Sequence, residues 1–226
     1  MYSDTVIVVG FAGFCKSDII LYFSRILYVL GEKVAIVDRS TEQQLRFYVP
    51  IAPFSEDMLE YRGVDIYLRC KNTPLGDIPK NNYSVVLIDF GINPETYEDL
   101  SQISTLFIIT DCNKQHTVPL SMWLSSQTVC PASIRIIRDI VSGKIRPRYI
   151  DSLLQAGQVT QIIAKYDFPL NEAEYYNRLL TQYDDVFSFT KLSAEFKNML
   201  LDCITEIFKK DRKTAMKGLR RAQIGG

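Results

Sequence analysis

The stretch VIVVGFAGFCKSD, residues 6–18, places an apolar, β-branched run directly before a loop with two glycines and a Lys-Ser pair. A run of this kind is expected for a strand that is buried on both faces of a sheet. The segment that follows, SDIILYFSRILYVLGEK at 17–33, has apolar residues at helical spacing and a glycine near its end. The sequence therefore predicts a strand, a loop over residues 10–17 and a helix.

Five further apolar runs extend this pattern along the chain. They lie at 33–38, 83–89, 105–110, 133–140 and 161–166. Most are separated by segments long enough to hold a crossover helix, which is typical of parallel strands. A polar region with turn signals follows the first of them, up to about Gly76. The predicted fold class is α/β, with a mostly parallel twisted sheet flanked by helices.

The composition limits the classes of protein to which the chain can belong. Its 226 residues, 47% of them hydrophobic, are enough to bury one core. The 26 basic and 26 acidic residues cancel, so no global field attracts nucleic acid or membrane. The five cysteines form no CxxC pair, which indicates reduced thiols. No apolar run approaches the ~20 residues that span a bilayer, and no basic leader is evident. A cytoplasmic location is expected, with contact to the inner face of the membrane left open.

Residues 10–17 lie where α/β proteins bind phosphate, beyond the carboxyl end of a strand and before a helix N-terminus. The usual Walker A pattern has glycine directly before Lys-Ser or Lys-Thr, and here Cys15 takes that place. An ordinary turn, capped by serine or aspartate, is the alternative. Asp38 and Asp89 end two of the apolar runs and bring acids to the same edge, which favours a nucleotide site.

The order of these elements resembles the ParA/MinD branch of the SIMIBI P-loop NTPases, which includes the TadZ and CpaE proteins. FAGFCKSD at 11–18 is similar to the family's phosphate-binding loop, VAIVDRS at 34–40 to its second strand, and YSVVLIDFG at 83–91 to its Walker B strand. IIAKYDFPLNEAEYYNRLL at 162–180 is similar to the late strand and the loop beside the base. The resemblance covers residues 5 to about 208 and implies a doubly wound P-loop NTPase fold in three layers.

The resemblance also implies which residues form the site. ATP or ADP with Mg²⁺ is the implied ligand, and Lys16, Asp38 and Asp89 would form the catalytic group. Ser17, Asp38 and Asp89 would hold the metal. The residues implied to contact the nucleotide are Phe11, Ala12, Gly13, Phe14, Cys15, Lys16, Ser17 and Asp18 in the loop, and Arg138, Asp139, Pro169 and Leu170 beside the base.

Three departures from the family pattern bear on hydrolysis. The family's signature lysine, which reaches the phosphates of the partner subunit, falls on Phe11, and the acid associated with the attacking water falls on Ser40. Cys15 replaces a glycine, at a cost of about 1–2 kcal/mol if a left-handed conformation is required. These losses predict a pseudo-ATPase with weak or absent hydrolysis. Phe11 and Phe14 are expected at the pocket mouth, covered by the second subunit of a homodimer, unless they fold inward.

The chain is interpreted as a P-loop NTPase-like domain at 1–208 and a basic C-terminal tail at 209–226. The tail carries seven basic side chains and one acid. Three interpretations of it remain open: a solvated helix end, adsorption to an anionic membrane, and, less favoured, binding to nucleic acid.

Two classes of function follow. The first is a ParA/MinD-like positioning or partitioning protein that recruits a partner machine, such as a pilus, secretion, conjugation, division or segregation apparatus. The alternative is a P-loop nucleotide or small-molecule kinase, whose lid over the phosphates would have to come from SGKIRPRYIDSLL at 142–154. That segment does not lie where such lids usually fall, so the positioning role is favoured.

Overall fold

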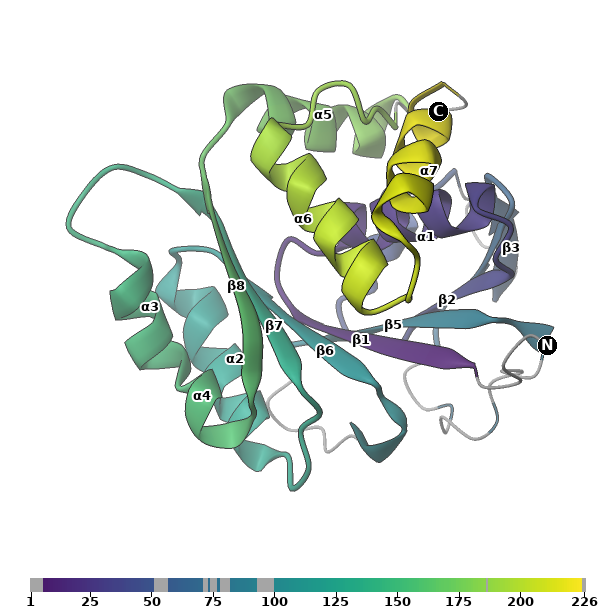
Figure 1. Cartoon of the computed structure of the whole chain (residues 1–226). Helices are drawn as coiled ribbons and strands as arrows, with labels where there is room; N and C mark the ends of the chain where they lie inside the picture. Colours follow the sequence, from purple (N-terminus) through teal and green to yellow (C-terminus); the bar gives the residue numbers. More distant parts are fainter. Residues whose placement is uncertain are drawn as a thin grey trace.

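The computed structural model describes residues 6–50, 57–70, 73, 77, 82–92, 100–185 and 187–224. Within them, eight strands form one twisted sheet in the order β3-β4-β2-β5-β1-β6-β7-β8 (Figure 1). Every neighbouring pair is parallel except β3 and β4. The strands are β1 (Ile7–Gly13), β2 (Val34–Asp38), β3 (Met58–Tyr61), β4 (Val64–Tyr67), β5 (Val85–Gly91), β6 (Thr105–Thr110), β7 (Ser133–Ile140) and β8 (Ile162–Pro169). The predicted mostly parallel sheet is confirmed, and its apolar runs are β1, β2, β5, β6, β7 and β8.

Helices cover both faces of the sheet and make the molecule three-layered, as predicted (Figure 1). They are α1 (Ser17–Val29), α2 (Lys114–Ser126), α3 (Pro147–Leu154), α4 (Ala156–Val159), α5 (Glu172–Tyr183), α6 (Ala194–Glu206) and α7 (Arg212–Ile224), with 3-10 turns at Gln44–Phe47 and Leu100–Gln102. One core, on the side of α1, α6 and α7, contains Phe23 and Phe107. The other core, on the side of α2, contains Phe90 and Trp123. Because alternate side chains of a strand point to opposite faces, the central strands contribute to both cores.

Strand β1 runs three residues further than the sequence pattern predicts, and this shortens the loop. Phe11 and Ala12 pair with β5 on one side, and residues 11–13 pair with β6 on the other. The Phe11 ring is buried and stacks on Phe107, with ring centroids 4.8 Å apart and ring planes 5° apart. The expectation that Phe11 lies at a pocket mouth under a second subunit is therefore wrong. For Phe11 the alternative is correct, since its side chain folds inward. Only residues 14–16 remain between β1 and α1.

A hairpin formed by β3 and β4 occupies part of the region that was predicted to be polar loop. Arg62 and Gly63, with φ of 52° and 83°, make its two-residue turn. Glycine is needed here, because a Cβ at position 63 would lie 2.1 Å from the Tyr28 ring. The alternating VDIY of β4 is the strand signal in the sequence, although four residues and a charge make it weak. Gly76, the expected end of the polar region, lies outside the described residues.

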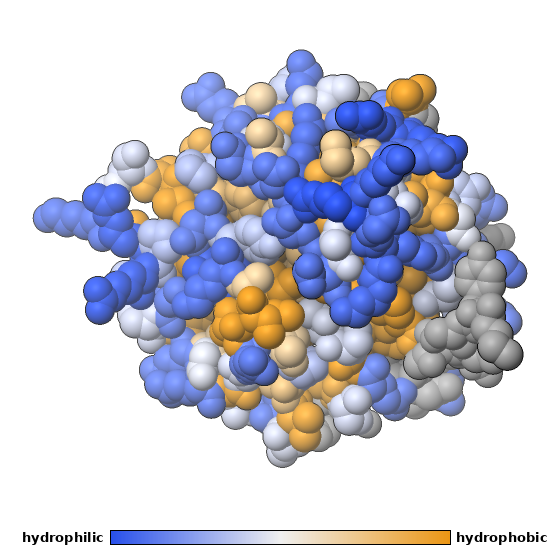
Figure 2. Space-filling view, in the orientation of Figure 1, coloured by the Kyte–Doolittle hydropathy of each residue, from blue (hydrophilic) through white to orange (hydrophobic). Residues whose placement is uncertain are grey.

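The basic C-terminal segment is not a solvated helix end, because residues 212–224 form α7, which packs against α1 and α6. The residues that α7 buries are Ala215, Gly218, Leu219 and Ala222. A Cβ at Gly218 would approach the Leu30 side chain within 2.8 Å, so the helix lies very close to the end of α1. The side of α7 that faces solvent is basic, and Figure 2 shows this area as mainly hydrophilic. Its exposed cations are Arg212, Lys213, Lys217, Arg220 and Arg221.

Among the described residues, no helix is both long enough and apolar enough to cross a membrane. The longest described helices have 13 residues, whereas a span needs about 20.

Candidate functional site

Gly13 and Cys15 set the course of the short loop between β1 and α1. Gly13 has φ +114°, and a Cβ there would lie 1.8 Å from the Ile109 carbonyl oxygen, so only glycine fits. The next residue, Phe14, donates its N–H to the same oxygen at 2.9 Å. Cys15 has φ 55°, the left-handed conformation in which a cysteine is strained. The expected cost of about 1–2 kcal/mol at this position therefore applies.

Lys16 forms an ion pair inside the protein rather than pointing into solvent. Its Nζ lies 3.0 Å from Asp89 Oδ1, and the two side chains are 1% and 0% exposed. The Gly91 N–H donates to the same carboxylate oxygen at 2.9 Å. The parallel register of β2 and β5 places Asp38 beside Asp89. The structure thus brings together the three residues that the resemblance implies as a catalytic group.

Asp38 is held by the turn that follows β2. Its Oδ1 accepts hydrogen bonds from the Ser40 N–H at 2.9 Å, the Ser40 hydroxyl at 2.5 Å and the Gln43 amide at 3.3 Å. Burial raises the pKa of Asp38 to about 7, and the charge of Asp89 adds to this shift. Burial also raises the pKa of Asp89, against the opposing effect of Lys16. Two buried carboxylates therefore share one lysine, which favours a proton on one of them near neutral pH.

Four buried oxygen atoms near the Lys16–Asp89 pair have no hydrogen-bond partner in the part of the chain that the structure describes. They are Ser17 Oγ, Asp38 Oδ2, Glu42 Oε2 and Asp89 Oδ2. Hydroxyl and carboxylate oxygens are ligands that Mg²⁺ prefers, so the implied metal residues fit this ion in their chemistry. No three His, Cys, Asp or Glu side chains among the described residues form a group that could hold a metal by itself. Water or phosphate oxygens would have to complete the coordination shell.

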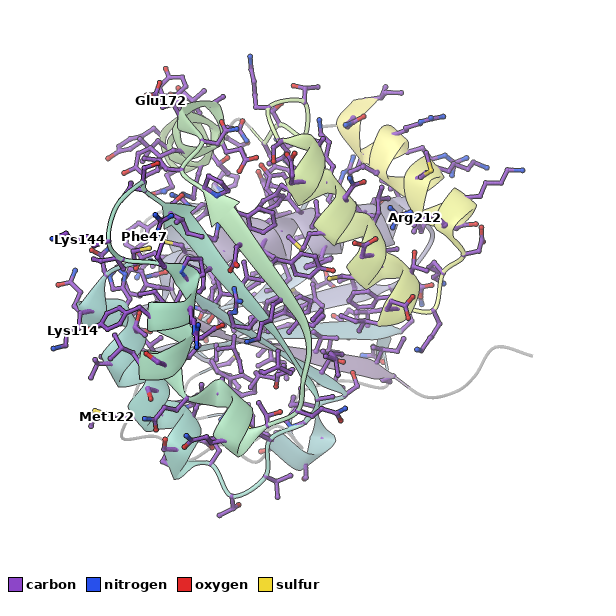
Figure 3. All side chains as sticks on the ribbon, turned by 60° about the vertical axis from the view of Figure 1, so that its left-hand side comes forward. Phe47, Lys114, Met122, Lys144, Glu172 and Arg212 are labelled. Atoms are coloured by element: carbon purple, nitrogen blue, oxygen red, sulfur yellow. The ribbon has the colours of Figure 1, made fainter. Side chains whose placement is uncertain are left out.

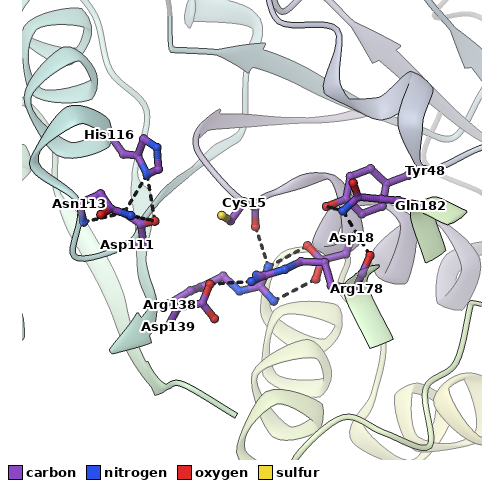
Figure 4. A network of polar contacts seen from close by, with 10 residues as sticks. All are labelled: Cys15, Asp18, Tyr48, Asp111, Asn113, His116, Arg138, Asp139, Arg178 and Gln182. Atoms are coloured by element: carbon purple, nitrogen blue, oxygen red, sulfur yellow. Dashed lines mark hydrogen bonds and ion pairs between the residues drawn. The ribbon is translucent and has the colours of Figure 1, made fainter. Parts of the chain in front are cut away.

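Arg138 contacts the loop itself, whereas its place in the family pattern predicts a position beside the base. Its Nη1 donates to the Cys15 carbonyl oxygen at 2.6 Å and to Asp18 Oδ1 at 2.7 Å (Figure 4). Its Nη2 donates to Asp18 Oδ2 at 2.9 Å. Both side chains are buried. Asp18 and Arg138 therefore form a two-point ion pair at the N-terminus of α1, in the loop that is predicted to bind phosphate.

A cavity of about 740 Å³ lies beside this loop. The residues that line it include Phe14, Cys15, Glu42, Phe47, Tyr48, Asp111, Asp139 and Arg178. Asp139 has φ 54°, and its Oδ2 accepts a hydrogen bond from Arg178 Nη2 at 2.7 Å. Pro169 and Leu170 are not in the lining: Pro169 ends β8, and the Leu170 N–H donates to the Ile140 carbonyl oxygen at 2.9 Å. Of the four residues that the resemblance implies beside the base, only Asp139 therefore lines the cavity.

Several residues of this cavity escaped the sequence analysis. Asp111 directly follows β6, so its position at a strand end is a signal that could have identified it. Its carboxylate lies 2.9 Å from His116 Nδ1, and the His116 ring stacks on Phe14 with centroids 3.5 Å apart. Glu42 follows Asp38 in the same turn. Arg178 comes from α5, within the segment 162–180 that resembles the family's late strand and base loop, but no motif marks this residue in it.

Three cations belong to the site, and each already faces a carboxylate. The pairs are Lys16 with Asp89, Arg138 with Asp18, and Arg178 with Asp139. The remaining charged side chains named here, Asp38, Glu42 and Asp111, are acids. The folded site is therefore acidic, and its cations are already paired, although Arg178 Nη1 is buried without a hydrogen-bond partner among the described residues and remains available to a phosphate oxygen.

No model of a protein family and no curated protein sequence matches the chain. A ParA family ATPase from Chlorobium tepidum TLS aligns with 97% of this chain and 98% of its own, at 16% identity and a TM-score of 0.56. A chain of the MinC:MinD cell division protein complex of Aquifex aeolicus aligns with 96% of this chain and 95% of its own, at 12% identity and a TM-score of 0.54. A variant of McdA from Cyanothece, in a complex with ATP, aligns with 96% of both chains, at 10% identity and a TM-score of 0.52.

At these identities the likeness shows the fold, and the ParA/MinD-type P-loop fold implied by the sequence is confirmed. The narrower resemblance to TadZ and CpaE stays a prediction.

Proposed function

We propose that this chain is a ParA/MinD-like positioning or partitioning protein with weak or absent ATP hydrolysis. The observation that carries the proposal is the buried Lys16–Asp89 pair, within a fold that aligns with ParA- and MinD-type proteins over 96–97% of the chain. The lysine of the phosphate loop is retained, yet a carboxylate already neutralises it. A protein of this kind acts by bringing a partner machine to a place in the cell, as a homodimer, rather than by rapid turnover.

ATP or ADP with Mg²⁺ is the proposed ligand, and it binds weakly. Lys16 would contact the phosphates, and Ser17, Asp38 and Asp89 would hold the metal ion, which neutralises phosphate charge when bound. The N-terminus of α1 contributes a favourable dipole. Because Lys16 has to exchange Asp89 for a phosphate oxygen, the affinity is expected to be micromolar at best.

Hydrolysis by the purified protein is expected to stay well below about one ATP per minute, because neither a cross-subunit cation nor a water-positioning acid is in place. Phe11 is a core residue, and the Ser40 hydroxyl is bound to Asp38. Phosphate release from Mg·ATP, followed over hours, checks this expectation. Ser17→Ala is the matched control, since the Ser17 hydroxyl has no partner to lose. Rapid turnover that this substitution removes would contradict the proposal, whereas activity that it leaves unchanged identifies a contaminant.

A fluorescent protein fused to the N-terminus, expressed in the cell of origin, tests the positioning role. Discrete foci or a polar cap are expected, and uniform fluorescence would contradict the proposal. Fractionation of the same cells tests an anionic surface as a contact. Since the exposed side of α7 carries five cations against two apolar residues, Met216 and Ile224, such a contact is mainly electrostatic, and high salt should release the protein. In Figure 3, Arg212 at the start of α7 lies on the opposite side of the view from Phe47 of the cavity, so the two surfaces are separate.

No observation favours the kinase alternative. Its lid would have to come from residues 142–154, which include α3. Ile150 and Leu154 of this helix are buried, and α3 packs against α2. A segment fixed in this way is not poised to close over phosphates, so the kinase class stays second.

A further inference from the structure

We infer that Arg178, on α5, is the anion-binding residue of the cavity: its Nη1 contacts a phosphate oxygen of the ligand, while its Nη2 stays on Asp139. The inference rests on the proposed function in one respect, that the ligand carries phosphate groups. It goes beyond that function by assigning the contact to a residue that the family pattern does not mark.

One nitrogen of the Arg178 guanidinium is left without an acceptor. Nη2 donates to Asp139 Oδ2 at 2.7 Å (Figure 4), and the guanidinium carbon lies 5.0 Å from the centre of the Tyr175 ring. Nη1 is buried, on a side chain only 7% exposed, and has no hydrogen-bond partner among the described residues. A buried charged donor without an acceptor is costly. Because Arg178 lines the cavity, an anion inside it can supply the missing acceptor.

Arg178 lies beside the loop that is predicted to bind phosphate. Cys15 of this loop lines the same cavity. Burial raises the pKa of the Cys15 thiol, and the positive charge of Arg178 is the largest effect that opposes this shift. An anion that enters the cavity between the loop and α5 therefore meets this cation.

The guanidinium keeps its charge although it is buried. Burial and the charge of Arg138 lower the pKa of Arg178, but the negative groups around it, among them Asp18 and Asp139, outweigh both and raise the pKa. Arginine is charged at any physiological pH in any case. A phosphate at Nη1 would therefore make a charge-assisted hydrogen bond, which is stronger than a neutral one.

Arg178 differs from Lys16 in what it has to give up. Lys16 must leave Asp89 before its ammonium group can meet a phosphate oxygen. The two nitrogens of the Arg178 fork allow it to keep Asp139 on one and to bind an anion with the other. Arg178 is thus the cation of the site that can bind a phosphate without opening an ion pair.

The other acids of the cavity leave room for an anion at Arg178. Asp111 accepts hydrogen bonds from the N–H and the side-chain amide of Asn113, both at 2.8 Å, and lies 2.9 Å from His116 Nδ1. Glu42 lies toward the end of β5, since a Cβ at position 91 would be 2.4 Å from its Oε2. Among the ion pairs of the described residues, Arg178 has neither of these acids as a partner.

The rest of the lining suits a ligand that has a flat ring as well as phosphate. Four aromatic residues line the cavity: Phe14, Phe47, Tyr48 and Tyr175. Ligand cavities commonly combine an apolar and aromatic lining with a few polar groups that fix the orientation. Its volume of about 740 Å³ is within the range of such cavities. Arg178 would be the group that orients the ligand here.

Arg178→Gln tests the inference, because it removes the cation and keeps a long polar side chain. Titration calorimetry with Mg·ATP should show an affinity about tenfold or more below that of wild type, since a hydrogen bond to a charged group is lost. Inorganic tripolyphosphate should show a loss of the same size. It has no base, so an equal loss for the two ligands assigns the effect to the phosphates.

Arg62→Gln is the matched control. Arg62 also has an aspartate partner, Asp185, an aromatic neighbour, Tyr61, and one nitrogen without a partner among the described residues, but it is outside this cavity. Its substitution should leave the affinity for both ligands at the wild-type value.

Asp139→Asn separates anion binding from a structural role of the pair. Asparagine keeps an oxygen that can accept from Arg178 Nη2, and it removes a negative charge beside the proposed anion. Affinity for tripolyphosphate and Mg·ATP should therefore rise. If the pair served only to brace the cavity, Asp139→Asn and Arg178→Gln would both weaken binding. Should Arg178→Gln protein not fold, the sign of the change in Asp139→Asn decides.

The inference is overturned if Arg178→Gln binds tripolyphosphate as well as wild type does, if Asp139→Asn weakens binding, or if wild-type protein binds no tripolyphosphate. ATP binding that Arg178→Gln leaves unchanged overturns it too, yet supports the proposed ligand. Conversely, tripolyphosphate binding that depends on Arg178, with no binding of ATP to wild type, removes the proposed ligand and leaves the inference intact. The fluorescent fusion tests the positioning role separately.

Discussion

Phe11→Lys should fail to fold, rather than create the catalytic lysine that the family has at this position. The Phe11 side chain is fully buried between Phe23 and Phe107, with ring centroids 6.2 Å and 4.8 Å away. Truncation of a buried phenylalanine costs about 3–5 kcal/mol, and an unpaired ammonium in the same place costs several more. Since domains have about 5–15 kcal/mol of stability in total, the substitution removes most or all of it.

Urea unfolding followed by circular dichroism checks this expectation, with Phe11→Leu as the control. Leucine keeps an apolar side chain of similar size, and its cost should stay near about 1–2 kcal/mol. A folded Phe11→Lys protein with a midpoint close to that of Phe11→Leu would show that the ring is not part of the core. In that case the lysine could reach solvent, and the loop would be more open than the structure has it.

Lys16→Met is the second substitution with a large expected effect, and the effect is on stability as well as on ligand binding. It leaves Asp89 buried without its cation, and removal of one partner of a buried ion pair costs about 3–5 kcal/mol. In an open phosphate loop the same lysine would be exposed, and its loss would weaken nucleotide binding with little change in stability. The two situations are therefore distinguished by unfolding alone.

The loss in Lys16→Met should also depend on pH. Burial raises the pKa values of Asp38 and Asp89 in the folded protein, and removal of Lys16 raises them further. A carboxyl whose folded pKa lies above its unfolded value binds more protons in the folded state, so stability falls as pH rises through that range. Relative to wild type, Lys16→Met should lose more stability at pH 8 than at pH 5, where the acids accept protons.

The urea midpoints of wild type and Lys16→Met at pH 5 and pH 8 measure this difference. Lys16→Met combined with Asp89→Asn is the control, because it removes the uncompensated charge, and it should recover part of the loss at pH 8. An equal loss at both pH values, or no recovery in the double variant, would show that the lysine is held by packing rather than by its charge.

The sequence predicted those parts of the fold that depend on short-range patterns. Continuous apolar runs identified the parallel strands, because a strand buried on both faces has no polar side. The end of β1 could not be predicted in this way, since glycines at 10 and 13 resemble a loop. Only the fit of Phe11 against Phe107, nearly 100 positions later, extends the strand. The small residues of α7 gave too weak an apolar signal, although such residues allow close packing on α1.

The candidate site was predictable in its members but not in its pairing. Lys16, Asp38 and Asp89 each lie at the end of a strand or the start of a helix, and strand ends converge at one edge of a parallel sheet. The partner of Asp18, by contrast, lies 120 positions away on β7. Whether Arg138 reaches the loop or a base depends on its rotamer and on the space around it, and neither is encoded in local sequence.

The extension of β1 restricts the movement of the short loop between β1 and α1. In this central strand Phe11 and Ala12 pair with both neighbours and Gly13 pairs with β6, so these residues are not free to turn toward a ligand. Releasing them would detach the strand from β5 and β6 and expose the Phe11 ring to water. Ordinary loops move in nanoseconds to microseconds, but the opening of a core strand costs nearly as much as unfolding the whole domain. Rapid changes at this site are therefore expected in side chains rather than in the backbone of residues 11–13, which opens too slowly.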